Sequence, residues 1–242
     1  MTIQYANIEW RKTKNNKPQP YSLDFNDIYF STDDGLQETN YVFIAHNQLK
    51  QRFSALTNET FCIAETGYGT GLNFLVIASH WLALAPKTAN LRFISIEKYP
   101  FHPADFSYAI NSWPQLSNLS SELVAQYKHL KIGFNCFKLL NNIELHLYIG
   151  DVVDVLPNLQ FADEIWVNAW LLDGFAPSKN PDMWHYETLN QMARVSTSGT
   201  TFATFTSASS VRKTLEQVGF HIEKHPGFGK KREMLAGYFY GH

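Results

Sequence analysis

The sequence has few cysteines, and this scarcity excludes a disulfide framework. Its 242 residues include only Cys62 and Cys136, and neither belongs to a Cys-x-x-Cys pair. A disulfide-rich secreted domain or a thiolate zinc site needs more thiols at closer spacing. The nine histidines form no His-Glu-x-x-His or comparable ligand set. We therefore expect two reduced thiols and no metal site.

Long apolar runs and an excess of positive charge are also absent. No segment approaches the length needed to span a bilayer, and the N-terminus lacks a basic stretch followed by an apolar one. These absences predict a cytoplasmic protein with no membrane partner. The net charge is −2, from 20 basic and 22 acidic residues, so any surface that binds nucleic acid must be local.

What is present is enough apolar sequence for one large α/β domain, at 45% hydrophobic and 15% aromatic residues. Apolar runs that predict strands recur at residues 61–64, 91–96, 143–149, 165–172, 200–206, 219–222 and 233–239. Most are separated by helix-length segments, which is typical of parallel strands joined by helical crossovers. The loop between the last two is too short for a crossover. The pattern predicts a seven-stranded mixed sheet with helices on both faces and an antiparallel last strand.

The chain divides into two unequal parts without a low-complexity linker. Residues 1–60 carry polar turns and predict an N-terminal hairpin region packed on the catalytic domain. Residues 61–242 form that domain. Within it, residues 98–142 are longer than a crossover requires, and we expect a helical insert there.

The most informative motif is a glycine-rich turn between the first predicted strand of this domain and a helix. Gly67, Gly69 and Gly71 let the backbone approach a ligand closely, and the free N–H groups at the helix start point into the same space. A dinucleotide fingerprint would need glycine where Leu72 stands. The acidic Glu65 would repel a pyrophosphate but attract a cationic amino-acid moiety. The motif thus favours S-adenosylmethionine over NAD.

Acidic residues follow three of the predicted strands, at the edge of the sheet where such folds bind ligands. Glu97 is placed to accept both ribose hydroxyls. Asp151 either accepts from the adenine amine, with Val152 against the ring, or simply forms a turn. Asp173 opens the loop after the fourth strand and faces the reactive end of the cofactor, while Phe175 offers an aromatic face for a flat base.

Three consecutive cations offer a local surface for nucleic acid. Lys230, Lys231 and Arg232 lie beside two glycines and Phe228. They either grip a phosphate while a base stacks nearby, or form a solvated charge run.

Four collinear stretches, at residues 65–74, 172–184, 203–208 and 227–235, resemble the methyltransferase half of the MnmC family of bifunctional tRNA wobble-uridine modification proteins. The resemblance covers nearly the whole chain. Tyr68 stands where the family usually has Phe, and Asn168 where Asp is frequent. Bifunctional members continue into an FAD-dependent oxidase, whereas this sequence stops at His242. We therefore expect an isolated domain or a single-function relative, working with an oxidase domain or a separate oxidase.

The resemblance implies a Rossmann-like class I fold and an N-methylation reaction. The expected reaction converts 5-aminomethyl(-2-thio)uridine in tRNA to its 5-methylaminomethyl form, with S-adenosylmethionine as donor and no FAD in this chain. The implied catalytic residues are Asp173 and Phe175, with Lys230, Lys231 and Arg232 on the nucleic acid. The implied cofactor-binding residues are Glu65, Gly67, Tyr68, Gly69, Thr70, Gly71, Glu97, Lys98, Asp151, Val152 and Asp173.

Two other functions stay open from the sequence. One is an S-adenosylmethionine-dependent methyltransferase of a small amine, which the near-neutral charge allows. The other is a non-catalytic module that binds the cofactor without turnover. Leu72 and Glu65 disfavour a dehydrogenase.

Overall fold

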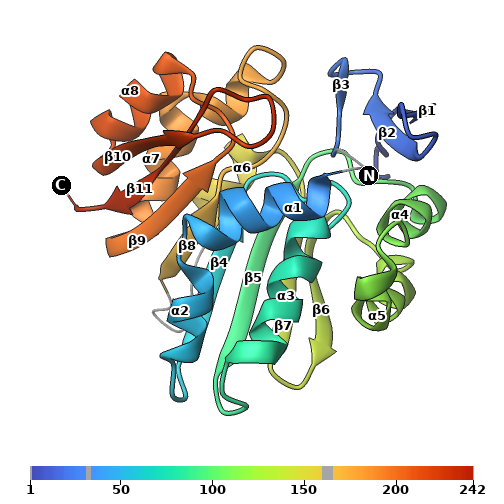
Figure 1. Ribbon diagram of the computed structural model, residues 1–242, viewed down its shortest axis with the longest axis horizontal. Coiled ribbons are helices and arrows are strands. Elements are labelled where there is room, and N and C mark those ends of the chain that lie inside the picture. The colour runs from blue at the N-terminus through green and yellow to red at the C-terminus, as the bar shows by residue number, and fades with distance from the viewer. Residues whose placement is uncertain (1, 31–33, 160–165, 242) are drawn as a thin grey trace.

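The computed structural model describes residues 2–30, 34–159 and 166–241, and within them the main sheet has eight strands in the order β10-β11-β9-β8-β4-β5-β7-β6 (Figure 1). In chain order the strands are β4 (Thr60–Glu65), β5 (Asn90–Glu97), β6 (Gly133–Leu140), β7 (Ile143–Ile149), β8 (Val167–Leu171), β9 (Ser196–Thr204), β10 (Phe220–Pro226) and β11 (Glu233–Phe239). The strands from β9 to β7 in this order pair in parallel, whereas β11 runs against β9 and β10, and β6 runs against β7.

Helices cover both faces of this sheet (Figure 1). One face carries α1 (Gly35–Thr39), the π-helix η1 (Asn40–Ala45), α2 (Leu49–Ser54), α3 (Leu72–Leu84), α4 (Pro103–Ile110), η2 (Pro114–Leu116) and α5 (Ser117–Tyr127). The other carries α6 (Val152–Val155), η3 (Leu156–Asn158), η4 (Pro181–Trp184), α7 (Tyr186–Arg194) and α8 (Ser209–Gln217). Helix α3 is apolar on nearly all sides because it lies between the sheet and other helices, and residues 72–78 are all buried.

This architecture confirms the predicted α/β class, the helices on both faces and the antiparallel final hairpin. The fourth predicted strand is β8; Ile165, which the prediction included, lies outside the described residues.

The expectation of a helical insert through residue 142 needs correction, because β6 forms its last part and is the eighth strand. Along β6 the side chains alternate, with Asn135, Phe137 and Leu139 buried and the residues between them exposed. Such alternation is typical of a strand with one face on the core and the other in solvent. It contains no continuous apolar run, which is the signal on which the sequence prediction of strands relied.

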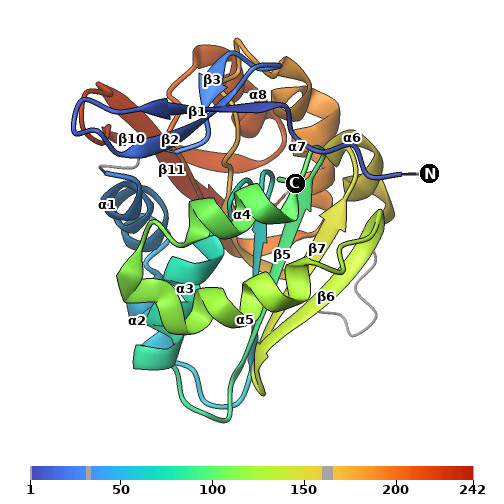
Figure 2. The ribbon, with the colours of Figure 1, turned by 90° about the vertical axis from the view of Figure 1, so that its right-hand side faces the viewer.

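The N-terminal region forms a small antiparallel sheet of β1 (Ile8–Lys12), β2 (Pro18–Ser22) and β3 (Asp27–Ile28), one strand more than a hairpin. Figure 2 places it beside α4 at one end of the molecule. The contact is specific, because the Trp10 indole donates to Asp105 at 2.9 Å and packs edge-on against Tyr108. This docking brings the β2–β3 connection to the carboxyl ends of the parallel strands.

Strand β4 pairs in parallel with β5 on one side and β8 on the other, so the strand order reverses at β4. Glu65 at the end of β4 is in register with Leu171 at the end of β8. The loops that follow these two strands therefore start side by side, and such a switch point is where open α/β sheets bind ligands. None of the helices in the described part of the chain is long and apolar enough to cross a membrane.

Candidate active site

A cavity of about 360 Å³ opens at the carboxyl ends of β4, β5, β7 and β8. It brings together most of the residues that the sequence predicts for the site. Those that line it are Gly67, Tyr68, Gly69, Thr70, Glu97, Lys98, Asp151, Val152, Asp173, Phe175 and Lys231. Glu65, Gly71, Lys230 and Arg232 do not line it.

The glycine turn owes its shape to residues without side chains. Gly69 and Gly71 have φ angles of +53° and +74°, and Gly71 caps the N-terminus of α3. A Cβ added to Gly67 would lie 3.1 Å from the Asp173 carbonyl oxygen. The turn therefore packs directly against the loop after β8, with its backbone facing the cavity.

Glu97 connects this turn to the end of β5. Its carboxylate accepts from the N–H of Gly69 at 2.8 Å and from the N–H of Tyr99 at 2.9 Å. Burial raises the pKa of Glu97, and these backbone donors oppose the rise. The acid is thus held rigidly beside the glycine turn.

Asp151 and Lys98 form an ion pair at the ends of the neighbouring strands β7 and β5. The Lys98 ammonium lies 2.7 Å from one Asp151 oxygen, and the other oxygen accepts from the Val153 N–H as the N-cap of α6. The hydrogen bond to Asp151 raises the pKa of Lys98. Both interpretations of Asp151 from the sequence remain, because it is a helix cap that also borders the cavity.

Asp173 follows the end of β8 and is held in one orientation. Its carboxylate accepts from the Gly174 N–H at 2.8 Å and from the Asn73 amide at 2.7 Å. Burial raises the pKa of Asp173 to about 6, since the two donors only partly offset the loss of hydration. Asp173 is therefore ionised at neutral pH and can accept a proton.

Glu65 does not reach the cavity, which corrects its predicted position. Its carboxyl group is buried behind Asn73 and accepts from Asn73 at 2.7 Å and from Ser95 at 2.7 Å. Asn73 thus donates to Glu65 and Asp173, while its own oxygen accepts from Thr39 at 2.7 Å. Burial, and then the charge of Asp173, raise the pKa of Glu65 well above its usual value.

Gly71 and Tyr68 support the turn more than they shape the cavity. The Tyr68 ring stacks on Phe106 within the core, and the space beside Gly71 is filled by the Tyr68 hydroxyl. Any side chain at position 71 would meet this ring.

Aromatic rings from the N-terminal region complete one wall, which the sequence analysis missed. Phe175 stacks on Phe25, with ring centroids 4.4 Å apart, and meets the edge of Tyr29 at 5.0 Å. All three residues line the cavity. No local pattern marks Phe25 or Tyr29, because they reach the site only through the docking of the small sheet.

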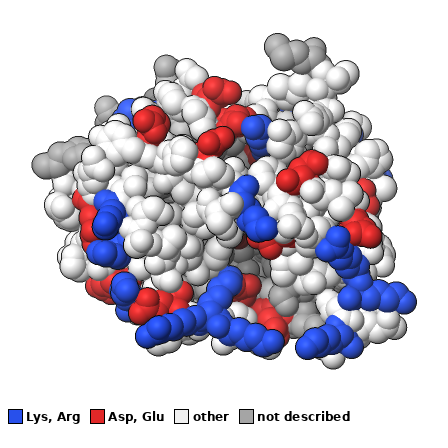
Figure 3. Space-filling model, turned by 90° about the horizontal axis from the view of Figure 1, so that it is seen from above, with Lys and Arg blue, Asp and Glu red and all other residues white. Residues whose placement is uncertain are grey.

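The three consecutive cations point in different directions. Lys230 and Arg232 are exposed and do not line the cavity, whereas Lys231 lines it, with its ammonium 2.7 Å from the Glu38 carboxylate. On the face that carries the strand ends, basic side chains gather along the lower edge and the right-hand side of the view, with acidic ones among them (Figure 3).

Acidic residues dominate the cavity. The acidic residues that line it are Asp27, Glu38, Glu97, Asp151, Asp173 and Asp182, against Lys98 and Lys231. Both lysines are already paired with a carboxylate, at 2.7 Å each. The cavity thus favours cationic ligands.

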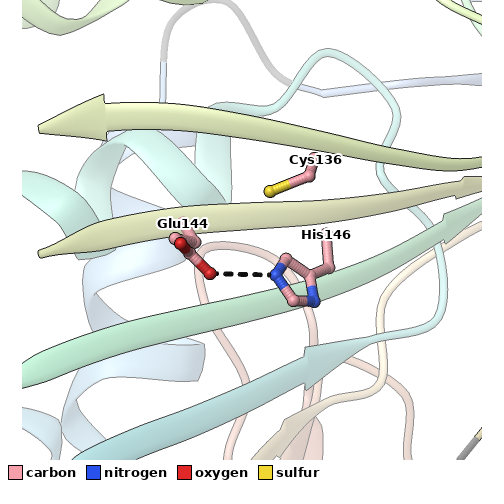
Figure 4. Close-up of side chains that lie close together, drawn as sticks. All are labelled: Cys136, Glu144 and His146. Atoms are coloured by element: carbon pink, nitrogen blue, oxygen red, sulfur yellow. Dashed lines mark hydrogen bonds and ion pairs between the residues drawn. The ribbon is translucent and has the colours of Figure 1, made fainter. Parts of the chain in front are cut away.

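A second group of polar side chains lies away from this cavity, on the β6–β7 hairpin. Cys136, Glu144 and His146 could hold a metal ion, and they are the one such group among the residues that the structure describes (Figure 4). However, Lys138 lies 3.0 Å from Glu144, and burial raises the pKa of the Cys136 thiol. A divalent cation would have to displace both the lysine and the thiol proton.

The doubly wound sheet, the glycine turn and the acidic cavity at the switch point define an α/β protein that binds a nucleotide-like cofactor. Residues 114–239 match the model of a family described as S-adenosyl-L-methionine-dependent methyltransferase, and the chain belongs to this family.

Curated relatives match nearly the full chain. The sequence is 48% identical over 240 residues to the tRNA 5-methylaminomethyl-2-thiouridine biosynthesis bifunctional protein MnmC of Chromobacterium violaceum, covering 98% of this chain and 35% of the relative. It is 44% identical to the protein of the same name from Methylobacillus flagellatus, covering 97% of this chain and 35% of that protein. The chain therefore spans about a third of the length of these relatives.

A solved structure supports the fold. MNMC2 from Aquifex aeolicus superposes with a TM-score of 0.75 at 19% identity, covering 98% of this chain and 72% of that one.

Proposed function

We propose that this chain methylates the amine of 5-aminomethyl(-2-thio)uridine at the wobble position of tRNA, giving the 5-methylaminomethyl form. The observation that carries the proposal is Asp173, a half-buried acid with a pKa of about 6 close to the stacked Phe175, in a cavity that the glycine turn borders. The names of the relatives supply the substrate class.

The cavity residues fit S-adenosylmethionine, which supplies an electrophilic methyl group when bound. Its amino-acid part and sulfonium suit the acidic wall, and the open backbone of Gly67 and Gly69 leaves room for close approach. Glu97 would hold the ribose, and Asp151 with Val152 the adenine. Lys98 positions Asp151.

The substrate amine must lose a proton before it can attack. An alkyl amine with a pKa near that of lysine, about 10.4, is almost fully protonated at pH 7, and the roughly three-unit gap corresponds to about 4 kcal/mol. The nitrogen lone pair forms the new N–C bond as the S–C bond breaks, and Asp173 takes the proton. Phe175 and its stacked partner Phe25 hold the uracil ring in line with the transfer.

The exposed cations beside the cavity mouth give tRNA a phosphate contact. Lys230 and Arg232 project outward from the β10–β11 turn, and Lys231 joins them when it leaves Glu38. An FAD-dependent oxidase, as a further domain or a separate protein, would prepare the aminomethyl group. Both reactions would take place in the cytoplasm, where tRNA is modified.

Nucleoside mass spectrometry tests the proposal. The chain is incubated with S-adenosylmethionine and tRNA that carries 5-aminomethyl-2-thiouridine, and we expect the mass of that nucleoside to increase by one methyl group. Methylation of free small amines but not of tRNA would favour a small-amine enzyme. Cofactor binding without turnover on either substrate would indicate a non-catalytic module.

A further inference from the structure

Lys231 places a primary ammonium group inside the candidate active site. Its nitrogen lies 2.7 Å from a Glu38 oxygen and 4.3 Å from the centre of the Phe205 ring. Lys231, Glu38, Phe205 and Asp173 all line the same cavity.

Glu38 and Phe205 together form a receptor for a cation. A carboxylate supplies a charge-assisted hydrogen bond, and the face of an aromatic ring attracts the same positive charge. Glu38 reaches the cavity from α1 and Phe205 follows β9, so elements far apart in the chain build the receptor. Glu38 also acts electrostatically on Asp173, raising its pKa, whereas Lys231 lowers it.

The end of a lysine side chain has the same chemistry as the reacting group of the substrate, since both carry a primary alkyl ammonium. We propose that Glu38 and Phe205 form the subsite that receives the substrate ammonium, and that Lys231 occupies this subsite until the substrate displaces it. The inference rests on the proposed function and names the residues that select an amine.

The turn that carries Lys231 is suited to such an exchange. Its backbone closes through hydrogen bonds from Gly227 to Arg232 at 3.2 Å and from Lys231 to Phe228 at 3.1 Å. The Tyr41 hydroxyl fixes its base by donating to the Pro226 carbonyl at 2.8 Å. The Lys231 side chain itself is 44% exposed. Rotation of this side chain clears the subsite without refolding the turn.

The exchange also conserves charge pairing. The substrate ammonium replaces the lysine on Glu38, and Lys231 swings toward the exposed side of the turn, where Lys230 and Arg232 lie. There it can pair with a phosphate of the same tRNA. Entry of the correct base is thereby coupled to a stronger grip on its backbone.

The test measures a preference rather than an absolute affinity. Binding of two tRNAs is compared, one with 5-aminomethyluridine and one with unmodified uridine at the same position. We expect the wild-type chain to prefer the aminomethyl form by about tenfold. Glu38→Gln, which keeps the side-chain shape, should reduce this preference to near one, and Phe205→Leu should reduce it several-fold. Lys231→Met removes the internal competitor together with the phosphate contact, so it is compared with the wild type in high salt, where that contact contributes little, and there it should increase the preference.

Lys230→Met is the matched control, because Lys230 neighbours Lys231 but does not line the cavity. This variant should lower the affinity for both tRNAs equally and leave the preference for the aminomethyl form unchanged. Calorimetric binding of S-adenosylmethionine confirms that each variant is folded. If Glu38→Gln still prefers the aminomethyl tRNA as strongly as the wild-type chain does, Glu38 does not bind the substrate ammonium and the proposed subsite is wrong. This conclusion requires that the wild-type chain methylates the aminomethyl tRNA. Failure of the wild-type chain to methylate that tRNA would instead refute the proposed function.

Discussion

At the scale of single residues, the buried Glu65 and the half-buried Asp173 share one amide. Asn73 donates to Glu65 and to Asp173, at 2.7 Å each. Burial, and then the charge of Asp173, raise the pKa of Glu65 well above its usual value, whereas burial raises the pKa of Asp173 to about 6. Glu65 is buried away from the cavity, whereas Asp173 lines it, so Asp173 is the one of these two acids that can meet a substrate.

Replacing Asp173 by Asn removes the proton acceptor but keeps the size of the side chain. We expect turnover of the aminomethyl tRNA to fall by about 10²-fold or more, as is typical when a general base is lost. The affinity for S-adenosylmethionine should change little. Asp154→Asn, an exposed acid on α6 outside the cavity, should retain full activity. Single-turnover kinetics with near-normal rates in Asp173→Asn would refute the assigned role.

The pKa of Asp173 also sets a pH dependence. Because burial raises this pKa to about 6, the free protein loses the proton acceptor as the pH falls through 6. The value of kcat/KM should therefore rise between pH 5 and 7 with an apparent pKa near 6, since this ratio reports groups of the free enzyme. In Asp173→Asn this rise of kcat/KM between pH 5 and 7 should be absent. A rise that persists in the variant would show that another group titrates.

Several predicted site residues that line the cavity lie at the carboxyl ends of strands. Glu97 is the last residue of β5, and Asp151 and Asp173 follow β7 and β8, so strand prediction alone brings them to one edge. Glu38 and Tyr29 come from the N-terminal region, and only tertiary packing brings them there. Thus the sequence predicted the part of the cavity lining that strand ends supply, and not the part that the N-terminal region supplies.

At the scale of elements, the fold followed from hydrophobic patterning wherever the strands are buried on both faces. Strand β6 was missed because it lies at the sheet edge, where one face is covered and the other meets solvent. Its alternating pattern carries fewer apolar residues than a central strand does. The short helix α1 was not predicted, since its five residues are too few to show a period.

The glycine turn at the start of α3 can be tested by stability measurements. At Gly71 a new Cβ would lie 2.5 Å from the Tyr68 hydroxyl, in addition to the strain of a φ of +74°. We expect Gly71→Ala to lower the free energy of unfolding by about 2–3 kcal/mol. Gly199→Ala is the control, since φ there is +89° but no atom lies within 4 Å of the added Cβ.

Urea denaturation compares the two variants. The Gly199 variant should lose only about 1 kcal/mol, the cost of backbone strain alone. Equal losses in both variants would show that the Tyr68 contact does not matter, and that the turn tolerates a side chain.

At the scale of the whole molecule, the cavity lies between two regions that are distant in the chain. The N-terminal region supplies the aromatic rings of Phe25 and Tyr29 to the cavity, and the β10–β11 turn supplies Lys231. The net charge of −2 gives no general attraction for tRNA. The proposed binding of tRNA would therefore depend on a few local phosphate contacts, which salt would weaken strongly.

Salt dependence measures how many phosphates the protein binds. Replacing Lys230 and Arg232 by Ala should lower the affinity for tRNA and reduce the slope of log K against log salt by roughly 0.7 to 0.9 for each phosphate that the variant no longer neutralises. Replacing Lys12 and Lys14, which lie on the N-terminal sheet and its turn, should leave the slope unchanged. The reverse pattern would move the tRNA surface to the N-terminal region.

The most direct single measurement is a crystal structure of the chain with S-adenosylhomocysteine, the product left after methyl transfer. We predict that its adenine lies against Val152, its ribose on Glu97, and its sulfur toward Asp173 and the Phe175 ring. A product bound outside this cavity, or with its sulfur directed away from Asp173, would contradict the proposed methyl transfer.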